Sequence, residues 1–275
     1  PLNKLTGLFD RVSDGYFDGD ISISGYSEIK QISEAFNQML GRIRELDQSR
    51  QEFVSNVSHE LKTPITSIKV LTDSLLLQEG APIELYKEFL KDISEEVDRE
   101  SKIINDLLSL VKLEKTTPDM NASTVNINEL LELILRRLRP IAAKSNIEVV
   151  LESFRPVVAE IDEVKLTLAI SNLVENAIKY NKVDGWVRVS LNADHKYFYV
   201  KVADSGIGIP TESQELVFER FYRVDKTRSR ETGGTGLGLA ITRNIINMHL
   251  GAIKFYSKEN EGTTFTVRIP LTYIP

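Results

Sequence analysis

Cysteine is absent from the 275-residue sequence, which excludes disulfide frameworks, thiolate metal sites and cysteine nucleophiles. The sequence also lacks a signal peptide and any run of about 18 apolar residues, the length that a membrane-spanning helix needs. Positive charge is not in excess, because the formal net charge is −6 and the pI is near 5.3. Since a polyanion is held by a summed positive field, a general nucleic-acid surface is excluded.

What remains is a chain of ordinary globular composition, with 41% hydrophobic and 27% charged residues. It begins at Pro1 rather than at a methionine, and Leu2, Leu5 and Leu8 already recur at helical spacing. The helical pattern is therefore already under way at the first residue. We expect the sequence to be an excised part of a longer chain.

Two long amphipathic patterns dominate the first part of the sequence. Apolar residues at alternating steps of three and four predict one helix, or two joined in phase, from about Glu28 to Leu77. The segment Gln78–Pro82 interrupts this pattern, and a second one from Leu90 to Val111 predicts the return helix of a hairpin. Neither helix can bury its apolar stripe alone, so we expect a dimeric four-helix bundle.

The pattern changes after a break at residues 116–121. Shorter helices are predicted over 128–144, 163–180 and 238–249, and strands over 147–152, 186–191, 197–203, 252–257 and 264–269. This mixture is typical of an α+β sandwich. The predicted fold is thus an all-α helical hairpin bundle, preceded by a coiled coil, plus an α+β sandwich domain.

One histidine in the first long helix has reactive neighbours. At about 100° per residue, His59 lies roughly 200° from both Val57 and Leu61, so it faces solvent if those two face the core. Glu60 places a carboxylate beside the imidazole, where it can orient the ring and take its proton while the other nitrogen attacks phosphorus. Thr63 lies one turn further on the same face. A lone exposed histidine is usually inert, so these neighbours carry the functional interpretation.

Two asparagines, Asn172 and Asn176, share one face of the helix predicted over 163–180. Amide oxygens suit Mg²⁺, a hard cation that bridges nucleotide phosphates. Lys179 lies one turn further, where it can meet phosphate charge. The alternative for either asparagine alone is a solvated polar helix face.

Asp204 follows a predicted strand, and the alternation places it on the same face as Phe198 and Val202. A carboxylate then lies where a core side chain is expected, and it needs a partner. Gly206 and Gly208 follow and allow the backbone to approach a ligand closely. This spacing is also common in ordinary turns.

A second glycine-rich segment, Gly233–Leu239, opens onto a predicted helix, whose free amides favour phosphate. A dinucleotide-binding fold uses similar glycines. No parallel strand immediately precedes these glycines, however. A basic stretch precedes them instead, with Arg223, Lys226, Arg228 and Arg230. The alternative for these basic residues is a solvated charged loop.

In combination, these segments resemble the boxes of sensor histidine kinases, in the family's order. Ser58–Pro64 resembles the H box, Asn172–Tyr180 the N box, Asp204–Pro210 the first glycine box, Phe218–Tyr222 the F box and Gly233–Leu239 the second glycine box. The opening segment, with its connector Asp14–Gly25, is similar to a HAMP module. One departure is Asn181, where serine or threonine often follows the N box.

The resemblance implies a protein-histidine kinase that uses ATP and Mg²⁺ in a Bergerat-type nucleotide-binding domain. His59 would be the phosphoacceptor, Glu60 its base, and Thr63 would serve dephosphorylation of the partner. Asp204 would accept a hydrogen bond from the adenine amino group. The implied nucleotide-binding residues are Asn172, Asn176, Lys179, Tyr180, Asp204, Gly206, Gly208, Ile209, Phe221, Arg223, Gly234, Thr235, Gly236, Leu237 and Gly238, with Asn172 and Asn176 as metal ligands.

The implied partners are a second copy of the chain, as a homodimer, and the receiver domain of a response regulator. An upstream transmembrane sensor segment is also implied, which makes the chain the cytoplasmic portion of a cell-membrane protein. The predicted domains are a HAMP-like linker over 1–48, a dimerisation and histidine phosphotransfer domain over 49–117 and a catalytic ATP-binding domain over 118–275.

Three alternatives stay open. One is a signalling scaffold that binds nucleotide without chemistry, and another is an ATPase or serine kinase of the same nucleotide-binding superfamily. Neither needs the pairing of His59 with Glu60. For Thr63, the alternative is an ordinary helix threonine bonded to the carbonyl of His59.

Overall fold

The computed structural model describes residues 27–77, 82–113, 120–225 and 234–274. By contacts, the chain divides into two compact units, Pro1–Thr66 and Ser67–Pro275. Most of the predicted HAMP-like segment, residues 78–81 of the predicted break and residues 116–119 of the predicted linker lie outside the described residues.

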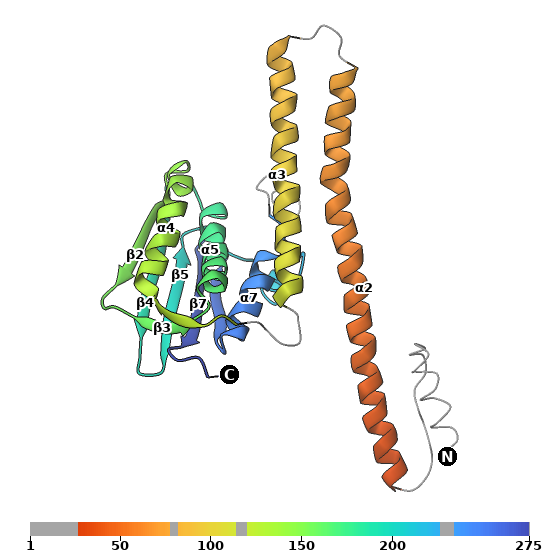
Figure 1. Ribbon diagram of the computed structural model, residues 1–275, viewed down its shortest axis with the longest axis vertical. Helices are drawn as coiled ribbons and strands as arrows, with labels where there is room; N and C mark the ends of the chain where they lie inside the picture. The colour runs from red at the N-terminus through yellow and green to blue at the C-terminus, as the bar shows by residue number, and fades with distance from the viewer. Residues whose placement is uncertain (1–26, 78–81, 114–119, 226–233, 275) are drawn as a thin grey trace. The chain divides into compact units, whose positions relative to one another are not determined.

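The two long helices that the sequence predicts are both present (Figure 1). Helix α2 spans Ser27–Leu76, within one residue of the predicted ends, and α3 spans Ile83–Leu113. Pro64 lies inside α2. Among the residues that the structure describes, no helix is long and apolar enough to cross a membrane.

A stripe of apolar side chains on α3 is exposed. Leu90, Val97, Ile104 and Val111 follow one another at intervals of seven residues, and their exposed fractions are 56%, 47%, 44% and 51%. A seven-residue repeat is typical of a helix that packs along a neighbouring helix. The stripe is therefore a surface that the described part of the chain does not cover.

The rest of the chain forms an α/β domain. Its elements are β1 (Ser123–Asn126), α4 (Ile127–Ala143), β2 (Glu148–Ser153), β3 (Val158–Ile161), α5 (Glu163–Lys179), β4 (Trp186–Ala193), β5 (Tyr197–Asp204), the 3-10 turn η1 (Thr211–Ser213), α7 (Gly238–Met248), β6 (Ala252–Lys258) and β7 (Gly262–Pro270). The predicted helices and strands are all present, and the combination of helical hairpin and α/β layers is confirmed. The short strands β1 and β3, which pair with each other, were not predicted.

A five-stranded mixed sheet, in the order β2-β4-β5-β7-β6, forms one layer of this domain. Helices α4, α5 and α7 pack against it as the second layer (Figure 1). Residues Phe198, Val200 and Val202 of β5 are buried, whereas Lys201 between them is exposed. The period of two expected for a sheet with one covered face is thus confirmed.

Candidate functional site

The predicted phosphoacceptor lies in α2, in the first compact unit. The side chain of His59 is exposed, whereas Val57 and Leu61 are half-buried, as the helical facing predicts. Thr63 is half-buried, and its hydroxyl donates a hydrogen bond to the carbonyl of His59 at 3.1 Å. The geometry described for Thr63 is therefore the back-bonded one that the sequence left as its alternative.

The predicted N box lies on α5, in the second unit. Asp162 caps this helix by accepting a hydrogen bond from the backbone N–H of Lys165 at 3.1 Å. The side-chain amide of Asn172 donates to the carbonyl of Gly238 at 3.2 Å, and the hydroxyl of Thr242 donates to the same carbonyl at 2.9 Å. The bond from Asn172 joins the N-box helix to the start of α7, where the second glycine box ends, and the bond from Thr242 lies within α7.

Asp204 is the carboxylate that strand alternation places on the core side of β5. Its Oδ1 accepts hydrogen bonds from the backbone N–H groups of Gly206, at 2.9 Å, and Thr263, at 3.2 Å. No hydrogen bond to its Oδ2 is present among the described residues. Burial raises the pKa of Asp204 to about 6, against the lowering effect of the two backbone hydrogen bonds. One oxygen is thus held in place and the other can accept from a ligand.

The glycines of the first box are required by the protein itself. A Cβ at Gly206 would lie 2.4 Å from the carbonyl oxygen of Tyr180, at the end of the N-box helix. Gly208 has φ +68°, and a Cβ there would lie 2.1 Å from the carbonyl oxygen of Lys258. At these two glycines the atoms that come close are therefore carbonyl oxygens of the protein's own backbone. This close packing fixes the turn after Asp204. Ile209 is held in the same turn by a hydrogen bond from its N–H to the hydroxyl of Ser257 at 2.8 Å.

The F box and the second glycine box lie against each other. The N–H of Phe221 donates to the carbonyl of Gly236 at 2.9 Å. Both residues have positive φ, +62° and +71°, and a Cβ at Gly236 would lie 2.8 Å from the backbone of Phe221. Leu237 is fully buried, and its N–H donates to the hydroxyl of Thr235 at 3.3 Å. Gly234 is described at the start of this segment, whereas the basic residues at 226, 228 and 230 lie outside the described part.

Lys179 lies in a positively charged environment. Its pKa is lowered to about 8, by burial first and then by the nearby charges of Lys102 and Arg223, with Glu175 opposing them. Its ammonium lies 5.0 Å from the centre of the Tyr180 ring. An anion stabilises a partly buried cluster of positive charges. The surroundings of Lys179 therefore fit the predicted contact between its ammonium and a phosphate.

Two residues of α3 contact this site and were missed in the sequence analysis. Lys102 forms an ion pair with Glu175 at 3.4 Å, and Asp106 accepts a hydrogen bond from the hydroxyl of Thr235 at 2.7 Å. Burial raises the pKa of Asp106. Their spacing of four residues places both on one face of α3, but that spacing did not indicate which face meets the second domain.

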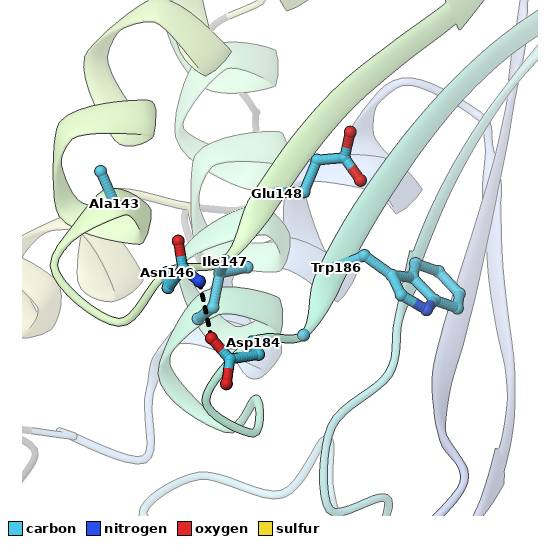
Figure 2. Close-up of a pocket in the computed structure, with 7 residues that line it drawn as sticks. Ala143, Asn146, Ile147, Glu148, Asp184 and Trp186 are labelled. Carbon is cyan, nitrogen blue, oxygen red and sulfur yellow. Dashed lines mark hydrogen bonds between the residues drawn. The ribbon is translucent and has the colours of Figure 1, made fainter.

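A shallow hollow elsewhere in the domain holds none of the predicted site residues. It is lined by Ala143, Asn146, Ile147, Glu148, Asp184, Gly185 and Trp186. Figure 2 shows Asn146 and Asp184 pointing toward each other, and a hydrogen bond of 2.6 Å joins them. The side chain of Trp186 points away from that pair. The predicted residues instead gather at α5, the turn after β5 and the start of α7.

Three protein families match consecutive parts of the chain. The family described as "HAMP domain" matches residues 1–45, and "His Kinase A (phospho-acceptor) domain" matches residues 49–116. The family described as "Histidine kinase-, DNA gyrase B-, and HSP90-like ATPase" matches residues 161–273. His59 lies in the second match, and the N and glycine boxes lie in the third.

Individual proteins agree with these matches. The chain is 38% identical over 228 residues to the sensor histidine kinase WalK of Bacillus subtilis, covering 82% of this chain and 37% of WalK. The chain therefore spans little more than a third of that relative's length. The nucleotide-free catalytic domain of the histidine kinase ThkA is 31% identical with a TM-score of 0.50, covering 56% of this chain and 97% of that domain. A crystal structure of ThkA in complex with the response regulator protein TrrA has a TM-score of 0.68 at 25% identity, covering 91% of this chain and 69% of ThkA.

Proposed function

Since the chain belongs to the HAMP-containing sensor histidine kinases of two-component systems, we propose that it phosphorylates itself on His59 from ATP and then passes the phosphoryl group to a response regulator. One observation carries the proposal. The chain carries an exposed histidine on α2, and its α/β domain brings together the N box, the two glycine boxes and a half-buried carboxylate with one oxygen left to accept.

The proposed reaction is an in-line phosphoryl transfer. A ring nitrogen of His59 donates its lone pair to the γ-phosphorus, the bond from that phosphorus to the bridging oxygen breaks, and ADP leaves. Glu60 accepts the proton of the other ring nitrogen, so that the phosphorylated imidazole is neutral. Lys179 and Arg223 stabilise the negative charge on the transferring group.

Asn172 and Asn176 are proposed to hold Mg²⁺. The donor side of the Asn172 amide is occupied by the carbonyl of Gly238, which leaves its oxygen for a cation. Among the described residues, no side-chain hydrogen bond of Asn176 competes with such a role. These ligands fit a hard cation, which when bound neutralises phosphate charge.

A homodimer is proposed from the exposed stripe on α3. Its seven-residue repeat is the pattern that a parallel or antiparallel helical neighbour buries, and a second copy of the chain can supply that neighbour. We also propose the domain boundaries given above. Because the chain spans only part of its relatives, its position behind a membrane sensor and its cytoplasmic location are proposals as well.

The response regulator is proposed as the phosphoryl acceptor because the related kinase ThkA was crystallised with such a protein. An aspartate carboxylate of the regulator would attack the phosphorus of phosphorylated His59, and the bond from phosphorus to nitrogen would break.

Incubation with ATP labelled at the γ-phosphate, followed by mapping of the phosphorylated residue, tests the proposal. We expect an acid-labile and alkali-stable phosphate on the peptide that contains His59. Labelling that resists acid would instead indicate a serine kinase, and nucleotide binding without labelling would indicate a scaffold.

The pH dependence of ATP binding should have two limbs. Below about pH 6, Asp204 gains a proton and no longer offers a free acceptor to the adenine amino group. Above about pH 8, Lys179 loses its charge, and the affinity should fall by ~10- to 100-fold by pH 10, because bound phosphate would raise its pKa by about one to two units. Titration calorimetry from pH 5 to pH 10 measures both limbs.

Lys179→Arg is the control for the alkaline limb, because arginine stays charged throughout this range. The variant should keep the acid limb and lose the alkaline one. An unchanged alkaline limb would exclude contact between Lys179 and the phosphates.

Thr63 is proposed to assist dephosphorylation of the regulator. Its hydroxyl hydrogen is donated to the carbonyl of His59, but the oxygen can still accept a hydrogen bond from a water aligned with an aspartyl phosphate. Thr63→Val keeps the branched shape and removes the hydroxyl, so it should lengthen the lifetime of the phosphorylated regulator by ~10-fold or more. Phosphorylation of His59 should stay near the wild-type rate.

Thr63→Ser keeps the hydroxyl and is the matched control, with a regulator lifetime close to that of the wild type. If both variants change the lifetime of the phosphorylated regulator equally, the hydroxyl of Thr63 does not act in dephosphorylation. If Thr63→Val also lowers the rate of His59 phosphorylation, Thr63 has only a structural role in α2.

A further inference from the structure

Asn181, the residue at which the chain departs from its family's N box, has a side chain whose hydrogen-bonding capacity is fully used. It is 9% exposed and follows directly after Tyr180, the C-cap of α5. Its Nδ2 donates to the carbonyls of Ala177 and Trp186, each at 3.0 Å. Its Oδ1 accepts from the N–H of Lys182, at 2.9 Å, and the hydroxyl of Ser205, at 3.0 Å. An asparagine side chain has two donors and two acceptor positions, and all four are occupied.

Two of these partners, Ala177 and Ser205, belong to different parts of the candidate site. Ala177 directly follows Asn176 in the last turn of the N-box helix, where carbonyls lack intrahelical donors. The N–H of Asn181 bonds to Ile178, so the side chain serves the carbonyl of Ala177. Ser205 directly follows Asp204 in the first glycine box. The amide of Asn181 therefore joins the end of the N box to the start of the glycine box.

Trp186 closes this connection into a ring of hydrogen bonds. Its N–H donates to the hydroxyl of Ser205 at 2.8 Å, and the N–H of Ser205 donates back to the carbonyl of Trp186 at 3.2 Å. Asn181 bonds both members of this pair. The chain also makes room for the amide, because a Cβ at Gly185 would lie 2.2 Å from its Oδ1.

We propose that Asn181, acting through Ser205, is a positioning residue that sets the carboxylate of Asp204 relative to the N-box helix and so determines the preference for adenine. The proposal rests on the proposed function, in which Asp204 accepts from the adenine amino group. Asp204 has its Oδ1 fixed by the N–H of Gly206, so its orientation follows the backbone at residues 205 and 206. Moving Ser205 moves the Oδ2 that would meet the base.

Comparison of ATP with inosine triphosphate tests the proposal, because the inosine base carries a carbonyl oxygen where adenine carries the amino group. The wild-type protein should bind ATP ~10- to 100-fold more tightly, since a buried acceptor facing another acceptor is left unpaired. Asn181→Ala should reduce this ratio to about 3-fold or less, mainly by weakening ATP binding. Binding is measured at a temperature well below the unfolding midpoint of each variant.

Asn128→Ala is the matched control. Asn128 also makes three side-chain hydrogen bonds between separate segments, to Ser153, Arg155 and Val157, but at the other end of the domain. The Asn128→Ala variant should be less stable than the wild type but should keep the wild-type ratio of ATP affinity to inosine triphosphate affinity. If Asn128→Ala lowers the ratio as much as Asn181→Ala, general loosening explains the effect and the proposal is wrong.

Ser205→Ala keeps the two bonds of Asn181 to Ala177 and Trp186, and it removes the link to the glycine box together with the hydroxyl that accepts from the N–H of Trp186. It should lower the ratio as Asn181→Ala does, and the double variant should be no worse than either single one, because both act through one connection. This variant decides the question if Asn181→Ala does not fold. A wild-type protein that binds no ATP would overturn the proposed function as well, whereas an unchanged ratio in Ser205→Ala overturns the positioning role alone.

Discussion

His59→Ala is expected to abolish incorporation of the γ-phosphate while leaving ATP affinity unchanged. The imidazole is proposed as the nucleophile, and His59 lies in a different compact unit from the boxes proposed to bind nucleotide. His59 is also exposed, so its removal leaves no cavity in a core. The measurements are labelling with γ-phosphate-labelled ATP and equilibrium nucleotide binding on the same preparation.

The matched control is His195→Ala, which removes an exposed histidine in the turn between β4 and β5. It should be labelled like the wild type. Acid-stable label remaining on the His59 variant would overturn the histidine-kinase assignment and favour a serine kinase. Loss of ATP binding together with label would mean that His59 supports the nucleotide domain, contrary to the separation proposed here.

The elements that carry the site were predictable because they are long or strongly periodic. The pattern from Glu28 to Leu77 gave α2 to within one residue at each end, and the alternation in β5 placed Asp204 on the buried face. By contrast, β1 and β3 have four residues each, which is too short for a period to be recognised. The two strands pair with each other, and the paired residues are more than 30 positions apart in the sequence.

The sequence was less informative about the contacts of the glycines in the first glycine box. The sequence suggested that Gly206 and Gly208 admit a ligand, whereas the described contacts are with the carbonyls of Tyr180 and Lys258. Such contacts depend on how α5 and β6 pack, which local spacing does not contain. The same holds for the bond between Asn172 and Gly238, and for the contact of Asp106 with Thr235. The roles proposed for individual site residues therefore stay predictions that the variants above address.

Glu60→Gln is expected to slow autophosphorylation of His59 by ~10²- to 10⁴-fold, the usual contribution of general acid–base assistance, with little change in ATP affinity. Glutamine keeps the length of the side chain and its acceptor oxygen, so it can still orient the imidazole, but it cannot take the proton. The rate lost then measures proton acceptance rather than positioning. Single-turnover labelling at saturating ATP gives the rate of the chemical step.

Glu52→Gln is the control on the same helix. Glu52 is exposed and accepts a hydrogen bond from Gln48 at 2.9 Å, two turns before His59. Its replacement changes the helix charge by the same amount and should leave the rate within about 2-fold of the wild type, as an exposed charge contributes little. The deficit of Glu60→Gln should also shrink as the pH rises, because hydroxide then replaces the missing base. A wild-type rate for Glu60→Gln, or an equal loss in both variants, would remove Glu60 from the proton transfer and leave solvent as the base.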